Sequence, residues 1–215
     1  MQGVQEVRQA IQRPTVDMPV NKVDLIPYKK LFIQVADYYS KGTFVIDTRN
    51  KDIIQSLFLY FLKQPGPLDT RKGLWLAGPV GTGKSTLMYV FSKFMQTLRL
   101  GFRVYVCSQI TTEYAMNGDL SRYLDNAGWS SMGPVDMCFD EVGREPIPAR
   151  YYGNGMNVMQ HIFHIRYSYW QQFGLKTYVT TNLLPEDVEC KYGDYIRDRR
   201  GEMFNLIELN GESRR

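Results

Sequence analysis

Nine consecutive residues constrain the fold of this chain more strongly than any other feature of its sequence. They read GPVGTGKST and match the pattern G-x-x-x-x-G-K-[ST] in full. The nine residues are Gly78, Pro79, Val80, Gly81, Thr82, Gly83, Lys84, Ser85 and Thr86. A short apolar run, 73–78, leads into them, and apolar residues at helical spacing follow over 84–100. This strand–turn–helix context predicts a phosphate-binding loop on an α/β core.

The residue types of this loop suit a nucleoside triphosphate and a magnesium ion. Glycines let the backbone curl so that several N–H groups face one anion. The start of the next helix adds unpaired N–H groups and the positive end of the helix dipole. Lys84 supplies a mobile charge for the β- and γ-phosphates, and the Ser85 hydroxyl is placed to ligate Mg²⁺. We therefore expect ATP and Mg²⁺ as ligands; the alternative is a glycine-rich turn that binds nothing.

Strand-like and helix-like segments alternate along most of the chain. Strands are expected at 73–78, 103–108, 135–140, 177–182 and 203–209, and helices at 52–64, 84–100, 111–126, 156–173 and 185–200. Apolar strands separated by helices are typical of a parallel sheet that is covered on both sides. The pattern predicts an α/β fold with a central parallel five-stranded sheet and helices on both faces.

Composition and charge are those of an ordinary globular protein. The chain has 215 residues, of which 44% are hydrophobic and 22% charged, so one α/β domain over 43–215 is expected. Residues 1–42 have weak periodicity and are interpreted as an N-terminal extension. The net charge of +4 is compatible with a nucleic-acid partner. No run approaches 18 apolar residues and no apolar leader is present, so we expect a cytoplasmic protein without a membrane segment.

Polar side chains follow two of the expected strands. Segment 135–140 ends in Asp140, and a carboxylate at the end of a buried strand is costly unless it meets a cation, here Mg²⁺. Glu141 is expected to accept a proton from the attacking water. Asn182 ends segment 177–182 and should reach the same cleft, where it would contact the γ-phosphate or orient that water. The alternatives are an exposed Asp-Glu pair that caps a loop and, for Asn182, a helix N-cap.

Several segments in a fixed order resemble the DnaC/IstB-like branch of the AAA+ ATPases. They are GLWLAGPVGTGKST, MCFDEVGRE, a YG dipeptide, a helix ending in IRY, TYVTTNL, KYGDYIRDRRGEM and LNGESRR. The resemblance covers about Phe44 to Arg215. It implies a P-loop NTPase of the AAA+ type, with the five strands in the order 5-1-4-3-2.

The resemblance also implies roles for individual residues. Lys84 and Ser85 would hold the phosphates and Mg²⁺. Asp140 and Glu141 would form the acidic pair, with Glu141 activating water. Asn182 is similar to the sensor-1 residue of the family, which favours the catalytic interpretation of its position over the N-cap.

An arginine near the carboxyl end is expected to act between subunits. The family has arginines two and six residues after the glycine of KYGDYIRDRR; here the first position is Tyr195 and the second is Arg199. Arg199 would reach the γ-phosphate of a neighbouring subunit as an arginine finger. Arg197 and Arg200 are close enough to replace it, and a solvated helix end is the alternative. Arg215, in the terminal G-x-S-x-R, is expected near the nucleotide phosphates.

By resemblance, the chain is expected to be an ATPase that is stimulated by oligomerisation or by DNA. The expected role is a DNA-replication helicase loader or a similar DNA-handling accessory, with single-stranded DNA and a replicative helicase as partners. One alternative is an IstB-like transposition helper that acts with a transposase. Two others are a P-loop phosphotransferase acting on a small molecule and a non-catalytic assembly module that uses ATP only to fix its shape.

Other conspicuous side chains are interpreted as structural. His161 and His164 lie three residues apart, but no Asp, Glu or Cys at ligand spacing accompanies them in their helix, so no metal site is expected there. Aromatic residues that invite base stacking are more often core residues; they are Tyr151, Tyr152, Tyr167, Tyr169 and Trp170. Basic side chains that could follow a DNA backbone, or belong to an ordinary surface, are Arg144, Arg150 and Lys191.

Overall fold

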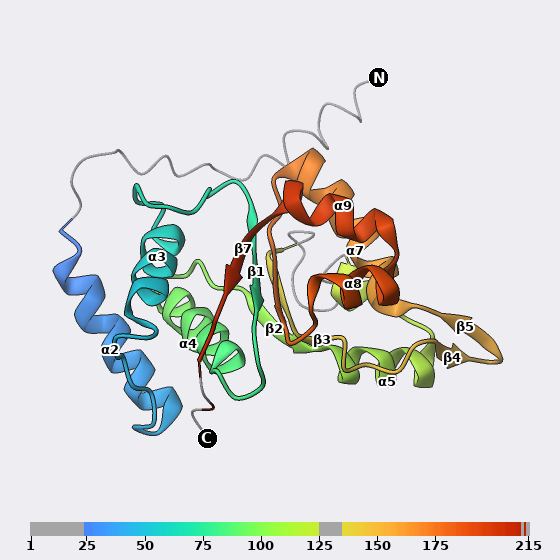
Figure 1. Ribbon diagram of the computed structural model, residues 1–215, viewed down its shortest axis with the longest axis horizontal. Helices are drawn as coiled ribbons and strands as arrows, with labels where there is room; N and C mark the ends of the chain where they lie inside the picture. The colour runs from blue at the N-terminus through green and yellow to red at the C-terminus, as the bar shows by residue number, and fades with distance from the viewer. Residues whose placement is uncertain (1–23, 125–134, 212, 214–215) are drawn as a thin grey trace.

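A computed structural model describes residues 24–124, 135–211 and 213, and its centre is a parallel sheet (Figure 1). The five strands are β1 (Gly73–Ala77), β2 (Arg103–Val106), β3 (Met137–Val142), β6 (Thr177–Thr181) and β7 (Phe204–Glu208). They lie in the order β2-β3-β6-β1-β7, and every neighbouring pair is parallel. The remaining two strands form a separate hairpin. When only the strands of the large sheet are counted along the chain, this order is 5-1-4-3-2, as predicted.

The central strands carry apolar side chains on both faces of the sheet. Along β1, Leu74 and Leu76 point into one cluster of buried residues, and Trp75 points into the other. Trp75 pairs in register with Val179 of β6, which lies in the same cluster as Trp75. Alternate residues of a strand face opposite sides, so strands this apolar need cover on both faces. The helices provide that cover.

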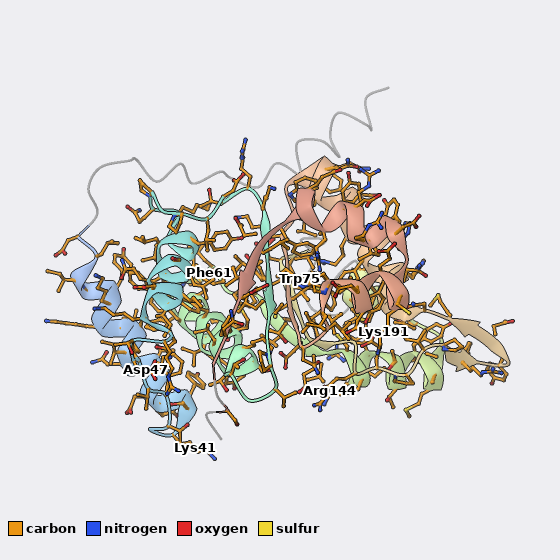
Figure 2. All side chains as sticks on the ribbon, viewed as in Figure 1. Lys41, Asp47, Phe61, Trp75, Arg144 and Lys191 are labelled. Carbon is orange, nitrogen blue, oxygen red and sulfur yellow. The ribbon has the colours of Figure 1, made fainter. Side chains whose placement is uncertain are left out.

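One face is covered by three helices with a largely aromatic interface. They are α2 (Ile26–Ser40), α3 (Lys51–Phe61) and α4 (Lys84–Thr97). Phe32 of α2 lies 4.8 Å from Phe91 and 5.4 Å from Phe94, measured between ring centroids. Phe61 of α3 stacks on Phe91, at a centroid distance of 5.0 Å. Figure 2 shows Phe61 and Trp75 in the two separate halves of the core.

The other face is covered by the helices that follow β2. They are α5 (Cys107–Asn117), α6 (Ser121–Leu124), α7 (Val158–Phe173), α8 (Pro185–Tyr192) and α9 (Asp194–Met203). Phe163 of α7 is buried against Trp75 and Phe139, with ring centroids 6.1 Å away in each case. In the described part of the chain, no helix combines the length and the apolarity that a membrane span requires.

The structure differs from the prediction at several boundaries and in the segment after β3. The second strand ends at Val106, and α5 begins at Cys107, where the buried thiol packs into the core. The expected helix 185–200 is two helices, because Gly193 adopts φ +82° and ψ +167° and breaks the run. The turn-rich segment after β3 contains an antiparallel hairpin, β4 (Ala149–Tyr151) and β5 (Asn154–Met156). The expected helix 111–126 is also two helices, α5 and α6, because Gly118 adopts φ +71° and ends α5. Residues 125 and 126 lie outside the described residues.

Helix α2 lies within the predicted N-terminal extension and packs on the domain. Its contact is mainly with α4, and it buries Phe32, Val35 and Ala36. The sequence does not show this clearly, because several apolar residues of the helix are exposed, such as Ile26, Ile33 and Tyr38, and do not mark one buried face. Residues 1–23 lie outside the described part of the chain, and the division into 1–42 and 43–215 stays a prediction.

We predict that Phe32→Ala destabilises the whole domain. Phe32 is 3% exposed and touches the core from the extension, and truncation of a buried phenylalanine costs about 3–5 kcal/mol. Urea unfolding followed by circular dichroism measures the loss. The matched control is Ile33→Ala on the same helix, where the side chain is 57% exposed and the expected change is within about 0.5 kcal/mol. Equal, small effects of the two substitutions would mean that α2 does not stabilise the domain.

Candidate functional site

The phosphate-binding loop connects β1 to α4, as the motif predicts. Helix α4 begins at Lys84, and Gly83 precedes it with φ +92°, in the left-handed region that glycine tolerates best. Gly78 begins the loop where the backbone of β7 passes close by. A Cβ atom at Gly78 would lie 2.2 Å from the carbonyl oxygen of Leu209. The loop can therefore follow this path only with glycine at both positions.

The amine of Lys84 is held against the loop itself. Its Nζ donates hydrogen bonds of 2.7 Å to the carbonyl oxygens of Gly78 and Pro79. Burial lowers the pKa of Lys84 below its usual value, and the nearby carboxylates of Asp140 and Glu141 act in the opposite direction. A charged amine under this desolvation penalty gains from contact with an anion such as a phosphate.

Asp140 lies buried at the carboxyl end of β3, and a threonine of the next strand holds it. The side chain of Asp140 is 7% exposed, and the Thr180 hydroxyl donates a hydrogen bond to its Oδ1. The same Thr180 oxygen accepts a hydrogen bond of 3.0 Å from the backbone N–H of Glu141. Thr180 therefore connects both members of the acidic pair. The sequence alone gives Thr180 no role, although its place beside Asp140 follows from the parallel pairing of β3 with β6.

Glu141 is turned out of the strand by an irregular backbone. Its φ is +59°, an uncommon conformation for a residue other than glycine. The register between β3 and β6 shifts between Phe139 and Val142, which marks a bulge. Bulges re-aim side chains at the edges of functional sites. Here the carboxylate of Glu141 reaches a pocket, while Asp140 beside it stays buried.

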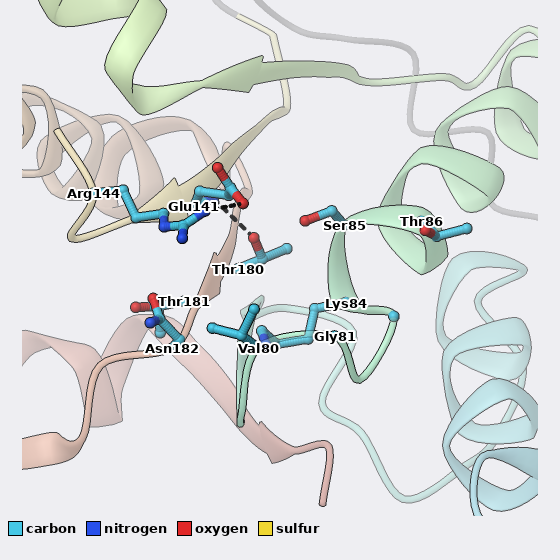
Figure 3. Close-up of a pocket in the computed structure, with 11 residues that line it drawn as sticks. Val80, Gly81, Lys84, Ser85, Thr86, Glu141, Arg144, Thr180, Thr181 and Asn182 are labelled. Atoms are coloured by element: carbon cyan, nitrogen blue, oxygen red, sulfur yellow. Dashed lines mark hydrogen bonds and ion pairs between the residues drawn. The ribbon is translucent and has the colours of Figure 1, made fainter. Parts of the chain in front are cut away.

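These elements surround one pocket at the carboxyl edge of the sheet (Figure 3). The residues that line it are Val80, Gly81, Gly83, Lys84, Ser85, Thr86, Glu141, Arg144, Thr180, Thr181 and Asn182. Its cavity volume is about 140 Å³, whereas pockets that enclose a whole small-molecule ligand measure about 300–1,000 Å³. The pocket therefore suits phosphate groups, and a nucleoside would lie outside it.

The structure brings together most of the predicted site residues. Asn182 follows β6, is exposed and lines the pocket. It is not a helix N-cap, because α8 begins at Pro185 with Leu184 in that position. Other predicted residues lie beside the pocket without lining it; they are Gly78, Pro79, Thr82 and Asp140.

Two side chains at this edge offer the oxygen ligands that magnesium prefers. The Ser85 hydroxyl faces the pocket from the first turn of α4, and the carboxylate of Asp140 lies behind Thr180. Mg²⁺ usually takes one or two protein oxygens and completes its shell with phosphates and water. In the described residues, no group of three or more His, Cys, Asp or Glu is arranged to hold a metal alone. The donor set therefore fits an ion shared with a phosphate ligand.

Arg199 does not line this pocket. Its Nη1 donates to the hydroxyl of Tyr167 at 2.9 Å and pairs with Glu202 at 3.1 Å. The guanidinium carbon lies 4.7 Å from the ring centroid of Tyr167 and 5.2 Å from that of Tyr195. Helix α9 leads directly into the amino end of β7, so Arg199 lies towards the edge of the sheet opposite the phosphate loop (Figure 1).

The neighbouring arginines are also engaged within the chain. Arg197 pairs with Glu189 and Asp198, and Arg200 lies over the ring of Trp75, where burial lowers the pKa of its guanidinium.

Near the carboxyl end of the sequence, Ser213 lies close to the phosphate loop: a Cβ atom on Gly81 would lie 2.4 Å from Oγ of Ser213. The terminal segment therefore reaches the phosphate loop, but the predicted phosphate contact of Arg215 lies outside the described residues.

Of the two histidines of α7, His164 makes a packing contact with α9. The ring of His164 stacks on Tyr195, with ring centroids 3.9 Å apart and an interplanar angle of 8°. The His164 side chain therefore has a structural role, because it packs between α7 and α9.

Comparison with known proteins establishes the fold. No family model matches the chain, and no curated protein matches its sequence. Among solved structures, the DnaC helicase loader is similar with a TM-score of 0.56 and 15% identity, over 85% of this chain and 99% of that one. DnaI is similar with a TM-score of 0.54 and 16% identity, over 97% of this chain and 93% of the DnaI chain. AMPPCP-bound DnaA from Aquifex aeolicus is similar with a TM-score of 0.51 and 16% identity. That similarity covers 79% of this chain and 49% of the DnaA chain. The chain therefore shares the α/β fold of these proteins.

Proposed function

We propose that this protein binds ATP with Mg²⁺, hydrolyses the ATP, and acts as a helicase loader or a similar DNA-handling accessory in replication. The observation that carries the proposal is the single pocket that joins the phosphate loop to Glu141 and Asn182. Each of these groups has a part in phosphoryl transfer to water, and together they are more informative than the loop alone. The likeness in fold to the DnaC helicase loader and to DnaI supports the biological role.

In this proposal, each side chain of the pocket has a distinct role. Lys84 and the loop N–H groups bind the β- and γ-phosphates. Ser85 and Asp140 hold Mg²⁺, which neutralises charge on the phosphate oxygens when it is bound. Glu141 takes the proton of the attacking water, and Asn182 orients that water or the γ-phosphate.

The rival functions differ in what accepts the phosphate and in what the protein assists. A phosphotransferase needs groups that bind its acceptor, whereas hydrolysis needs a base and a polar group that orient a water, the roles proposed for Glu141 and Asn182 at the pocket. A non-catalytic assembly module would bind ATP and leave it intact. A transposition helper would use the same chemistry with a transposase as partner, and the fold likeness to DnaC and DnaI favours the helicase.

We predict that Glu141→Gln keeps ATP bound and stops its turnover. The amide cannot accept the proton, and general-base catalysis contributes about 10²–10⁴-fold to such reactions. Phosphate release in the absence of any added acceptor measures turnover, and calorimetry measures binding. Lys84→Ala is the companion variant, and it should bind ATP too weakly to detect. Unaltered phosphate release by the Glu141→Gln protein would exclude Glu141 as the base.

Self-association is part of the proposal, because Arg199, the expected finger, does not line the pocket of its own chain. Arg199 lies at the other edge of the sheet, so it would serve the pocket of a neighbouring copy of this chain. To do so it must exchange its contacts with Tyr167 and Glu202 for a phosphate. Arginine fingers of this kind contribute about 10³–10⁵-fold to turnover.

We predict that Arg199→Ala removes the stimulation of turnover by assembly or by DNA and leaves ATP affinity nearly unchanged. The matched control is Arg197→Ala, two residues away on the same helix, which should keep the stimulation. ATPase rates are measured over a range of protein concentrations, with and without single-stranded DNA. A collapse of ATP affinity in Arg199→Ala would contradict a role in trans.

The β4–β5 hairpin is the proposed contact for single-stranded DNA. It projects from the domain (Figure 1), and Tyr152 at its turn is 89% exposed, so the prediction that this side chain is a core residue is wrong. Its base is anchored, because Tyr151 packs on Tyr114 of α5 with a ring-centroid distance of 6.2 Å. Arg150 is exposed on the same hairpin and carries a positive charge suited to a phosphate backbone. An exposed ring on an anchored hairpin is a platform on which a base of any sequence could stack.

We predict that Tyr152→Ala weakens binding of single-stranded DNA by about tenfold, since stacking of a base on an aromatic ring contributes about 1–3 kcal/mol. Fluorescence anisotropy of a labelled oligothymidylate at fixed salt measures the affinity. Tyr38→Ala is the control, because Tyr38 is 76% exposed but lies on α2. Equal affinity of the two variants for the oligonucleotide would exclude the hairpin as the stacking site.

A further inference from the structure

Arg144 is a second cation in the pocket wall, to which no part in the chemistry has been assigned. Its Nη1 donates a hydrogen bond of 3.0 Å to Oε1 of Glu141, and both residues line the cavity. Figure 3 shows the guanidinium and the carboxylate side by side, across the pocket from Ser85 and Thr86. Lys84 and Arg144 thus bring positive charge to the same cavity from two different elements.

The backbone that carries Arg144 is held by hydrogen bonds to the buried carboxylate of Glu145 and to Lys191 of α8. The N–H of Gly143 donates to the carboxylate of Glu145 at 2.8 Å, and Glu145 is 4% exposed. The hydroxyl of Tyr192 donates to the same carboxylate, and Nζ of Lys191 donates to the carbonyl of Gly143 at 2.6 Å. The turn after β3 is therefore tied to α8. Because its backbone is held, Arg144 is presented to the pocket at a defined position.

The contact between Arg144 and Glu141 is one that a phosphate can displace. The side chain of Arg144 is 49% exposed and that of Glu141 is 35% exposed. Ion pairs with this much exposure are weak. A guanidinium binds a phosphate through two parallel hydrogen bonds, and a terminal phosphate carries more charge than one carboxylate. A triphosphate in this cavity would therefore compete with Glu141 for Arg144.

We propose that Arg144 recognises the γ-phosphate and, by exchanging Glu141 for it, distinguishes a nucleoside triphosphate from a diphosphate. This inference rests on the proposed ATP site. Without a γ-phosphate, the guanidinium holds the carboxylate of Glu141 and keeps that base in an ion pair. With the γ-phosphate in place, the guanidinium turns to the phosphate and Glu141 is released to accept a proton from water. Arg144 would thus couple recognition of the triphosphate to the availability of the base.

The test compares the affinities of the full chain for AMPPCP and for ADP by calorimetry with Mg²⁺ present. Arg144→Ala should weaken AMPPCP binding by about tenfold, the range expected for loss of a hydrogen bond to a charged group, and change ADP binding less than twofold. Arg144→Lys should recover part of the loss, because it keeps the charge but not the paired donors. Thermal unfolding confirms that each variant is folded.

A double-mutant cycle tests the exchange itself. Glu141→Gln removes the competing carboxylate, so it should tighten AMPPCP binding about threefold when Arg144 is present and leave it unchanged in the Arg144→Ala background. The proposal is overturned if Arg144→Ala weakens both nucleotides equally or neither of them. It is also overturned if the Glu141→Gln effect persists without Arg144. If the unmodified chain binds neither nucleotide, the proposed ATP site itself is wrong.

Discussion

Parallel hydrogen bonding between β1, β6 and β3 is the constraint on which the site depends. In a parallel sheet the carboxyl ends of neighbouring strands meet at one edge. Ala77 of β1 pairs with Thr181 of β6, and Phe139 of β3 pairs with Val179 of β6. These two pairings bring the start of the phosphate loop to the same edge as Asp140 and Thr180. A one-residue slip of either pair would turn these side chains to the other face. The chemistry of the pocket therefore rests on the register of the sheet.

The two halves of the core hold that register in place. On one side, stacked phenylalanines join α2, α3 and α4 to the sheet. On the other side, Trp75 and Phe139 pack on Phe163 of α7. Strands buried on both faces cannot shift without exposing apolar surface on each side. This packing gives the loop after β1 and the bulge in β3 a rigid base.

Within the pocket, the charges are arranged so that a phosphate ligand would change several contacts at once. Lys84 is bound to loop carbonyls, and Arg144 is bound to Glu141. Both cations are held by groups that an incoming anion can replace. The buried contacts of Asp140 with Thr180 and of Glu145 with Tyr192 lie behind this layer. A fixed buried layer beneath exchangeable contacts of Lys84 and Arg144 suits the proposed cycle of binding, reaction and release.

The sequence by itself determined the α/β class and the place of the phosphate loop. These two follow from local signals: the glycine motif, apolar runs of strand length and the alternation of strands with helices. The strand order of the sheet was implied only by the resemblance to a known family. The sequence also pointed to Asp140, Glu141 and Asn182, because the carboxyl ends of parallel strands share one edge. Only the tertiary structure showed that Thr180 joins the acidic pair, that α2 belongs to the packed core and that Arg144 faces Glu141. Those facts depend on contacts between segments far apart in the chain or on the exact path of a turn, and no periodic pattern in the sequence records either one.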